Sequence, residues 1–501
     1  MSAAHEVNVI ADNLPALQVV IPLLGALLCA LLNRGWLAWF VTMVICLIMP
    51  VISITLLLTV LDSGPISYSM GGWAPPFGIE YRVDIINAFI LVLVSVIGAV
   101  VLPYARLSVV AEIKAEDRPW FYAMFLLCLT GLLGITITGD AFNAFVFLEI
   151  SSLSTYVLIA LGRDRRALLA AYQYLILGSI GATFYIIGVG IIYTLTGTLN
   201  FADLAGRISE VEQTRSILAA AAFIVVGISL KFALFPLHVW LPNAYAYAPS
   251  SVTVFLASTA TKVALYLLIR FLFSIFGIEI VIEKLAFSGI LIILSLAAMF
   301  GASIVAIFQH DVKRLFAYSS VAQIGYITLG IALANQAGLT GSLVHMFNHA
   351  IMKGALFMAV GAVVYRIGSA QIDDFSGLGK KMPITMGCLL IGGLGLIGVP
   401  GTAGFISKWY LAIGALEAGY IWLVFMLVLS SLLALIYVGR IVEVVWFREA
   451  GPELENVKEA PLSLLVPTIL LAAATIYLGI ETSQSAGIAA QAAKLLLAGM
   501  K

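Results

Sequence analysis

Charge is what this sequence has least of. Asp, Glu, Lys and Arg make up only 10% of its 501 residues, whereas 62% of the residues are hydrophobic. A soluble domain carries about 25% charged residues, so the composition predicts an all-α membrane protein that crosses the bilayer many times. The formal net charge is zero, which argues against nucleic acid or a polyacidic partner.

Cysteine is also scarce, and its four copies lie singly in apolar runs at Cys29, Cys46, Cys128 and Cys388. This spacing excludes a disulfide framework or a zinc site, and we expect small buried hydrophobic side chains instead. The sequence has no phosphate-binding loop, no dinucleotide fingerprint and no haem or iron–sulfur spacing. We therefore expect no cofactor and no metal, with energy supplied by an ion gradient or by partner subunits.

Apolar runs of roughly 20 residues, enough to cross the hydrocarbon layer as a helix, fill most of the chain. A polar stretch at 62–84, rich in Gly, Pro and aromatic residues, predicts a small extramembrane hairpin. We count fourteen spans, at 15–33, 36–61, 85–105, 119–138, 141–161, 168–195, 216–241, 250–276, 284–308, 312–335, 340–366, 383–415, 419–445 and 461–481.

Lysine and arginine in the loops indicate the orientation. With the N-terminus outside, the inner loops hold fifteen of these residues and the outer segments hold six. Both termini are thus predicted to face away from the cytoplasm. The inner residues are Arg34, Arg106, Lys114, Arg118, Arg163, Arg165, Arg166, Lys313, Arg314, Arg366, Lys380, Lys381, Arg440, Arg448 and Lys458; the outer ones are Arg82, Arg207, Arg215, Lys284, Lys494 and Lys501.

Two apolar runs each combine a lysine with a proline break. The first, GISLKFALFPLHVWLP, has Lys231 before Pro236, and the second, GGLGLIGVPGTAGFISKWY, has Pro400 before Lys408. Proline removes a helix hydrogen bond, and an ammonium group at mid-membrane costs about 2.5 to 3.5 kcal/mol on insertion scales. Lysines beside helix breaks are the pattern expected where an ion path crosses a membrane.

The chain also contains an internal repeat. GVGIIYTLTGTLNFADL, with Tyr193, resembles GAVVYRIGSAQIDDF, with Tyr365, and the two tyrosines lie 172 residues apart. We predict one membrane domain over 1–501, with a first repeat at 119–276 (spans four to eight) and a second at 284–445 (spans nine to thirteen). Five spans is an odd number, so the two copies insert with opposite orientation, each with one broken helix.

Glu149 lies in the fifth span, far from any other charged residue in the sequence. Burial disfavours its charged form and a nearby cation favours it, and Lys231 is the candidate partner. A Glu–Lys pair whose separation changes acts as a proton switch. The alternative is a static buried ion pair that fixes helix register.

Lys262 lies at the centre of the eighth span, where burial turns an amine into a group that releases its proton readily. The alternative, snorkelling to the interface, is difficult from that position. Arg270, near the outer end of the same span, is predicted to snorkel. Lys313 and Arg314 are interpreted as orientation signals, and Asp140 and Asp311 as helix caps.

His345, His349 and Lys353 are spaced at i, i+4 and i+8 in the eleventh span, which places all three on one helix face. A zinc site would need a further ligand nearby, so a proton-relay stripe fits better. A hydrogen-bonded pair of core histidines is the alternative. His238, after the Pro236 break, is a further candidate without such neighbours.

Several long segments resemble the antiporter-like subunits shared by respiratory complex I, membrane-bound hydrogenases and Mrp-type multisubunit cation/proton antiporters. In the first half they are FLEISSLSTYVLIAL, KFALFPLHVWLPNAYAYAPSSVT and FLASTATKVALY. In the second half they are HDVKRLFAYSSVAQIGY, HMFNHAIMKGALF and GVPGTAGFISKWY. The resemblance extends from about the third span to the thirteenth.

The resemblance implies fourteen helices in two inverted five-helix repeats, with a polar axis along the midplane. It implies that Glu149 pairs with Lys231, that Lys262 links two half-channels, and that Lys408 completes the chain of charges. A lysine at 408 favours the D type of Mrp antiporters or the N type of complex I, and the fifth span is most similar to the Mrp D type.

Our hypothesis is a proton-translocating subunit of a multisubunit Na⁺/H⁺ antiporter in a bacterial plasma membrane, working with other membrane subunits. One alternative is the pump arm of a quinone-reducing dehydrogenase or a hydrogenase; another is a scaffold whose charges only hold partner helices. The proton-transfer candidates are Glu149, Lys231, Lys262, His238, His345, His349, Lys353 and Lys408.

Overall fold

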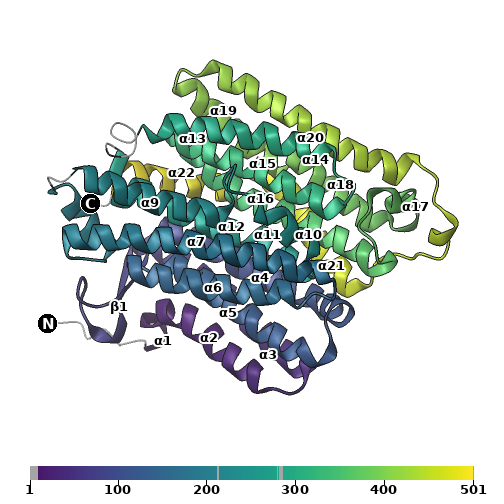
Figure 1. Cartoon of the computed structure of the whole chain (residues 1–501), viewed down its shortest axis with the longest axis horizontal. Coiled ribbons are helices and arrows are strands. Elements are labelled where there is room, and N and C mark those ends of the chain that lie inside the picture. Colours follow the sequence, from purple (N-terminus) through teal and green to yellow (C-terminus); the bar gives the residue numbers. More distant parts are fainter. Residues whose placement is uncertain (1–8, 212–213, 279, 281–285, 500–501) are drawn as a thin grey trace.

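The computed structural model describes residues 9–211, 214–278, 280 and 286–499. Long helices run side by side along one direction and form a single bundle (Figure 1). In chain order they are α1 (Val9–Asp12), α2 (Leu14–Leu31), α3 (Gly35–Ser63), α4 (Ile85–Glu112), α5 (Arg118–Ile137), α6 (Ala141–Ala160), α7 (Arg165–Thr196), α8 (Phe201–Ile208), α9 (Thr214–Phe232), α10 (Trp240–Tyr247), α11 (Ser250–Ser258), α12 (Ala260–Ile269), α13 (Phe287–Ala297), α14 (Ser303–Ile307), α15 (Val312–Leu333), α16 (Gln336–Ile367), α17 (Leu378–Lys381), α18 (Pro383–Ile397), α19 (Ala403–Glu417), α20 (Ile421–Phe447), α21 (Leu462–Ile480) and α22 (Ser483–Ala498).

Short helical turns and two strands complete the structure. Two π-helical segments, η3 (Arg270–Ile275) and η5 (Ala298–Ala302), interrupt long helices. The remaining turns are η1 (Met70–Gly72), η2 (Ala115–Asp117), η6 (Ile372–Phe375) and η7 (Pro452–Leu454).

Within the described residues, thirteen helices are long and apolar enough to cross a membrane. The expected twelfth span is divided between the shorter helices α18 and α19, so the predicted all-helical membrane fold is confirmed. Residues 284 and 285, where the ninth span was expected to begin, lie outside the described residues, as does Lys501.

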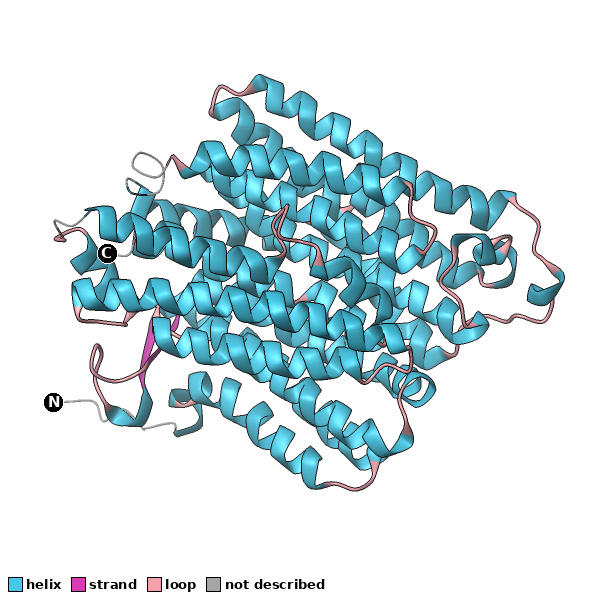
Figure 2. Ribbon diagram, in the orientation of Figure 1, coloured by secondary structure: helices cyan, strands magenta, loops and turns pink. Residues whose placement is uncertain are grey.

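The predicted hairpin is present as strands β1 (Ile66–Ser69) and β2 (Glu80–Val83), paired antiparallel with Ile66 opposite Val83. Figure 2 shows the strands at one end of the bundle, beside α1. The hairpin also joins the transmembrane part, because Tyr81 forms a β-bridge with Thr138, after α5. We call this the hairpin end of the bundle.

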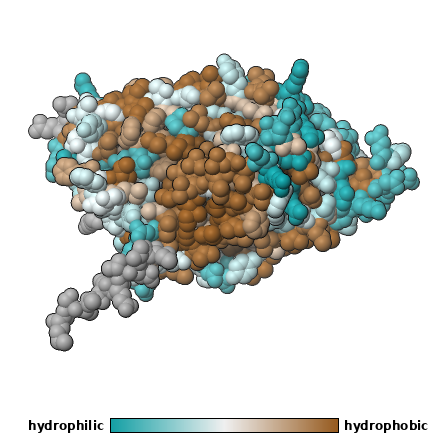
Figure 3. Space-filling view, turned by 90° about the horizontal axis from the view of Figure 1, so that it is seen from below, coloured by the Kyte–Doolittle hydropathy of each residue, from teal (hydrophilic) through white to brown (hydrophobic). Residues whose placement is uncertain are grey.

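The surface of the bundle fits a bilayer. Seen from below Figure 1, the face is hydrophobic over its middle and hydrophilic at its right-hand end (Figure 3). Large apolar side chains of α2 and α3, including Leu27 and Phe40, are more than half exposed. Such a band between polar ends is what a multi-pass protein presents to lipid.

The break in the seventh span begins earlier than predicted. α9 ends at Phe232, and Ala233 has a φ of 61°, before Pro236 is reached. Because Pro236 cannot donate to the carbonyl of residue i−4, which is Phe232, and its ring clashes with that carbonyl, the helix must end there. Proline also disfavours helical geometry at the residue before it.

The eighth span has a break that the sequence did not predict. α11 ends at Ser258 and α12 begins at Ala260, with Thr259 between them at φ −123°. The run from 250 to 276 has neither glycine nor proline, so the usual signals of a break are absent. Lys262 therefore lies beside a helix interruption, as Lys231 and Lys408 do.

Asp140 and Asp311 are confirmed as helix caps. Asp140 accepts a hydrogen bond from the Asn143 N–H at 2.7 Å, and Asp311 accepts one from the Arg314 N–H at 2.9 Å. Each also forms an isolated antiparallel bridge, Asp140 with Asn200 and Asp311 with Gln371. The first bridge lies at the hairpin end, beside Thr138, and the second lies beside Lys313, at the opposite end.

Candidate functional site

The structure places Glu149 of α6 against Lys231 of α9. Their Oε1 and Nζ atoms are 3.3 Å apart, and the Lys231 ammonium also donates to Ser152 Oγ at 2.8 Å. Lys231 is 5% exposed, but the side chain of Glu149 is 26% exposed. The pair therefore lies at the edge of the bundle, with its amine buried and its acid partly uncovered.

A small cavity adjoins Lys231. It holds about 20 Å³ and is lined by Lys231, Ser151 and Ser152 on one side and by Ala260 and Ala264 of α12 on the other. A water molecule needs about 10–15 Å³ and two to four polar partners. The cavity thus has room for one water between Lys231 and the helix that carries Lys262.

Lys262 is 1% exposed, at the centre of the bundle. Its ammonium donates to the carbonyl oxygen of Ala257, in the last turn of α11 before the Thr259 interruption. Its helix, α12, packs both against α9, which carries Lys231, and against α16, which carries His345, His349 and Lys353. Lys262 therefore stands between the first group of charges and the second.

The two histidines of α16 are fully buried and stack on each other, with ring centroids 5.8 Å apart. His345 Nδ1 lies 2.6 Å from Ser407 Oγ and its Nε2 lies 2.9 Å from Gln323 Oε1. Neither ring nitrogen of His349 has a hydrogen-bond partner among the described residues. His345 is thus fixed by neighbours, whereas His349 has two free positions.

Lys353, one turn beyond His349, is also fully buried. Its ammonium donates to the carbonyl oxygen of Phe316 at 2.6 Å and to Ser319 Oγ. It lies over the rings of Phe316 and Phe357, at 5.5 and 5.7 Å from their centres. The stripe predicted from the i, i+4, i+8 spacing therefore exists as one buried face.

Lys408 belongs to the second broken span. From α19 it donates to the carbonyl oxygens of Leu396 and Ile397, at 3.0 and 2.9 Å, in the last turn of α18. The last carbonyls of a helix lack partners within it and carry partial negative charge. The break in the twelfth span thus creates the binding place of its own lysine.

Side chains connect Lys408 to the histidines. Ser431 Oγ accepts from Lys408 at 2.9 Å and lies 3.5 Å from the Tyr326 hydroxyl. The Tyr326 ring in turn lies 5.7 Å from the His345 ring. Lys408, Tyr326 and His345 therefore form a continuous contact series.

His238 is not brought into this series by any contact the structure records. It lies in the loop between α9 and α10, half-buried, with its ring stacked on Phe235 at 5.0 Å and edge-on to Tyr318 at 6.3 Å. Its surroundings are aromatic rather than charged.

Several side chains that complete the site were not predicted from the sequence. Gln323 could have been predicted, because it is a lone amide in an apolar span and a buried amide is nearly always hydrogen-bonded to a buried partner. The serines carried little, since serine and threonine occur throughout these helices, where they bond to the preceding turn. The unpredicted contacts are Ser152, Ser319, Gln323, Tyr326, Ser407 and Ser431.

The prediction that Arg270 snorkels to the surface is wrong. Arg270 is only 5% exposed, and its guanidinium binds both carboxylate oxygens of Asp84, which also caps α4. Its Nε donates to the Tyr266 hydroxyl at 3.0 Å. A partner 186 residues away in the chain thus holds the charge inside the protein.

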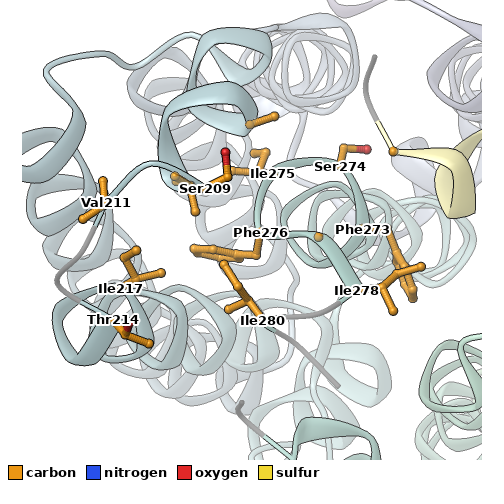
Figure 4. Close-up of a pocket in the computed structure, with 14 residues that line it drawn as sticks. Ser209, Val211, Thr214, Ile217, Phe273, Ser274, Ile275, Phe276, Ile278 and Ile280 are labelled. Carbon is orange, nitrogen blue, oxygen red and sulfur yellow. The ribbon is translucent and has the colours of Figure 1, made fainter. Parts of the chain in front are cut away.

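A separate cavity of about 330 Å³ lies between η3 and the ends of α8 and α9 (Figure 4). Phe273, Phe276, Ile217 and Ile280 surround it. The described residues that line it are apolar, glycine or hydroxyl side chains, so this part of the lining supplies no group that titrates near neutral pH.

Comparison with known proteins places the chain among membrane subunits. The family model described as "NADH:quinone oxidoreductase/Mrp antiporter, TM" matches residues 138–434. The N-type subunit of NADH-quinone oxidoreductase from Desulforudis audaxviator is 41% identical over 487 residues, covering 94% of this chain and 96% of that protein. The D-type subunit of the Na⁺/H⁺ antiporter from Alkalihalophilus pseudofirmus is 31% identical over 470 residues, covering 93% of this chain and 94% of that protein. A chain of the membrane-bound sulfane sulfur reductase, an archaeal respiratory membrane complex, superposes with a TM-score of 0.90 at 31% identity, covering 97% of this chain and 98% of that one.

Proposed function

Because the chain belongs to the NADH:quinone oxidoreductase/Mrp antiporter family of transmembrane subunits, we propose that it carries protons across the membrane through its row of buried amines and imidazoles. It is an antiporter-like membrane subunit that works together with other membrane subunits. The proton-transfer groups are Glu149, Lys231, Lys262, His345, His349, Lys353 and Lys408, with His238 as a side position beside the Pro236 break.

One observation carries the proposal: titratable side chains gather in the best-buried part of the molecule. Lys262, His345, His349 and Lys353 are each at most 1% exposed, on α12 and α16. Charges inside a membrane protein are costly and mark ion paths and proton relays. A purely structural role would not require four groups that can each gain or lose a proton.

Buried water would complete the path. His349 has two ring nitrogens without partners, and Ser258 Oγ and Asn348 Oδ1 are likewise unpartnered among the described residues. Buried polar groups are nearly always hydrogen-bonded, if not to protein then to ordered water. We infer that water molecules connect Lys262, His349 and Lys353. We also infer that one water in the small cavity extends the path from Lys231 in the direction of Lys262.

The coupling is electrostatic. When Lys231 approaches Glu149 its ammonium form is favoured, and when the pair separates the amine gives its proton to the water beside it. A proton arriving at Lys262 on α12 disfavours a further proton at His349 and Lys353 on α16, because the two helices pack together and like charges repel. Motion of one charge thus changes the proton affinity of its neighbour along the row.

We also propose that 119–276 and 284–445 are inverted repeats. The Asp140–Asn200 and Asp311–Gln371 bridges support this, because corresponding residues are 171 positions apart in the chain. The bridging hydrogen bonds correspond as well: Ala141 N to Leu199 O and Val312 N to Ala370 O are both 2.8 Å. The bridges lie at opposite ends of the bundle, as inversion requires.

Partner subunits would cover the two ends of the row. Glu149 is partly exposed at mid-span on α6, and Lys408 is only partly buried on α19. A charge facing lipid is strongly disfavoured, so each edge requires a protein neighbour. This is why we expect activity from the assembled complex rather than from the single subunit.

The proposed task is exchange of H⁺ for a monovalent cation, Na⁺, in a bacterial plasma membrane, with both termini on the non-cytoplasmic side. The relative named as a Na⁺/H⁺ antiporter component supports the exchange, and the excess of Lys and Arg in the inner loops supports the orientation.

A second candidate is proton pumping driven by a redox reaction in partner subunits. It is favoured by the 41% identity to a protein named as a component of NADH-quinone oxidoreductase. The same residues would carry the protons in both cases. Identifying the co-purifying subunits separates the two, because iron–sulfur subunits accompany only the second.

The proposal is tested in the purified complex, reconstituted in liposomes with a pH-sensitive dye inside. Lys231→Ala and Glu149→Ala should abolish proton transport while the complex still assembles, whereas Lys380→Ala, at an exposed position of the short helix α17, should transport normally. Normal transport in both Lys231→Ala and Glu149→Ala would refute a proton path through this pair.

A further inference from the structure

Lys313 is a buried amine that the proposed path does not use. The sequence indicates a loop charge, yet Lys313 is 5% exposed and lies in the first turn of α15. Its ammonium donates to Ser250 Oγ at 3.0 Å. A lysine held inside the protein at the end of a helix calls for a function or a strong partner.

Ser250 joins Lys313 to an acid. Its hydroxyl donates to Glu112 Oε2 at 3.2 Å, and its backbone N–H donates to the same oxygen at 2.9 Å. The other carboxylate oxygen of Glu112 accepts from Ser108 Oγ at 2.7 Å. An amine, a hydroxyl and a carboxylate thus form one hydrogen-bonded series across the ends of α15, α11 and α4.

This series lies at the wall of a cavity of about 380 Å³, at the end of the bundle opposite the hairpin end. Glu112 and Lys313 line it together with two exposed arginines, Arg163 in the loop after α6 and Arg166 in the first turn of α7. Asp164 and Asp311 line the same cavity, so protons that enter from that face meet these two carboxylates as well as Glu112 and Lys313.

One ridge of side chains on α16 leads from this cavity to the histidines. An added Cβ at Gly361 would come within 2.8 Å of Ser250 Cβ, so this glycine lies directly against the series. Residues four apart on a helix are neighbours along a ridge that winds slowly around the helix. From the site toward the cavity, this ridge carries His345, His349, Lys353, Phe357 and Gly361.

Aromatic rings separate Lys353 from the series. Phe357 meets Phe316 edge-on at 6.3 Å and Tyr245 edge-on at 5.9 Å. All three are at most 1% exposed, and the Lys353 ammonium lies over the Phe316 and Phe357 rings. The rings form an aromatic layer between two polar regions.

We propose that Glu112, Ser250 and Lys313 form a proton-loading port, and that the Phe316–Phe357 pair is the gate between this port and Lys353. The inference rests on the proposed function and names the place where protons reach the α16 row. When the rings part and water enters, the Lys313 ammonium gives one proton through that water to the Lys353 amine. Glu112, protonated from the cavity, then returns one proton to Lys313 through the Ser250 hydroxyl. The net result is one proton moved from cavity to Lys353, with the port restored.

The port is tested by its dependence on pH at the cavity side. In the reconstituted complex, Lys313→Met and Glu112→Gln should slow transport about tenfold when that side is at pH 8, and less as it is brought to pH 6. Matched controls are Lys114→Met and Glu116→Gln, exposed positions in the following loop, which should transport normally. Wild-type rates in Lys313→Met, or a loss that is equal at every pH, would overturn the port.

Arginine at 313 separates a proton carrier from a structural charge. Lys313→Arg keeps a positive donor but does not release its proton near neutral pH, so it should assemble normally and still transport slowly. Normal transport in Lys313→Arg would overturn the port. Lys231→Ala and Glu149→Ala are measured beside it. If both are inactive while Lys313→Arg transports normally, the port fails and the proposed function stands. Normal transport in both Lys231→Ala and Glu149→Ala removes the proposed function itself.

The gate is tested without a transport measurement. Lys353→Cys, in a complex whose four native cysteines in this chain are buried, is treated with a small cationic thiol reagent from the cavity side. Labelling should be slow with Phe357 in place and at least tenfold faster after Phe357→Ala, with Phe357→Leu between them. Equal labelling rates with and without the Phe357 ring would overturn the gate.

Discussion

The ammonium nitrogen of Lys408 lies 4.5 Å from the centre of the Tyr326 ring, and that ring lies 5.7 Å from His345. Lys408 therefore has an aromatic face on one side and helix carbonyls on another. A desolvated cation–π contact contributes about 2 kcal/mol. The tyrosine both holds the charged amine and continues the contact series toward the histidine.

Replacing this ring should slow proton transport. We expect Tyr326→Leu to lower the rate about tenfold, because it removes the aromatic face and the hydroxyl near Ser431, and Tyr326→Phe to lower it less, because it keeps the face. Dye-detected proton flux in proteoliposomes measures both. A rate for Tyr326→Phe as low as that for Tyr326→Leu would show that the hydroxyl, not the face, matters.

Breaking the Asp84–Arg270 pair should destabilise the protein. Their side chains are 15% and 6% exposed, and removing one partner of a buried pair costs about 3–5 kcal/mol. We expect Arg270→Met and Asp84→Asn each to lower the melting temperature of the complex. The decrease in the double variant should be smaller than the sum of the two single decreases. Additive losses would contradict direct coupling.

An exposed pair provides the control for that experiment. Arg207 and Asp203 pair at 3.0 Å with side chains 46% and 27% exposed. Such pairs contribute about 0–1 kcal/mol, so Arg207→Met should change the melting temperature little.

A side chain at Gly227 should disturb the packing of α9 on α7. An added Cβ would lie 2.6 Å from Gly181 O and 2.6 Å from Tyr185 N, both backbone atoms. Small residues allow such close approach of membrane helices. We expect Gly227→Ala to reduce the amount of assembled complex, measured by size-exclusion chromatography. Gly190→Ala, with no atom within 4 Å of the new carbon, should assemble as wild type does.

The cap of α15 should make stability depend on pH. Burial raises the pKa of the Asp311 carboxyl, while the Arg314 N–H and the Lys313 charge lower it in part. A carboxyl with a raised folded pKa favours folding below its unfolded value, about 3.9. That contribution is lost as the pH rises through the folded pKa.

Asp311→Asn keeps an oxygen that accepts the helix N–H and removes the charge. We expect this variant to melt above wild type at pH 7 and to converge with it near pH 4, in thermal unfolding of the complex. Asp311→Ala, which lacks the cap, should lose about 1 kcal/mol. If Asp311→Asn melted below wild type at pH 7, the burial cost would be smaller than the charge attraction.

The helices and the charged residues of the candidate site could be predicted from the sequence alone. A lone Glu149, Lys262 or Lys353 in an apolar run is visible without a structure, because the surrounding residues cannot solvate it. The breaks at Pro236 and Pro400 were also predictable, since proline removes a specific hydrogen bond. These signals are local.

What the sequence left out depends on residues far apart in the chain. Arg270 and Lys313 lie near the ends of their spans, and only the positions of Asp84 and Ser250 decide that their charges point inward. The interruption at Thr259 has no local signal. Hydropathy shows where a helix runs, but not which of its neighbours faces a charge.

Three lysines of the candidate site are held by main-chain carbonyls. Lys262 and Lys408 donate to Ala257, Leu396 and Ile397, at helix interruptions, and Lys353 donates to Phe316, within α15. A neutral amine still has N–H groups that donate to a carbonyl, so these hydrogen bonds persist after deprotonation. Because a carbonyl oxygen has no formal charge, deprotonation leaves no unpaired anion. Lys231 differs, because its loss of a proton would leave Glu149 alone. Lys262, Lys353 and Lys408 thus keep their main-chain hydrogen bonds whether charged or neutral. Lys231 must stay charged to balance the Glu149 carboxylate while the two are paired.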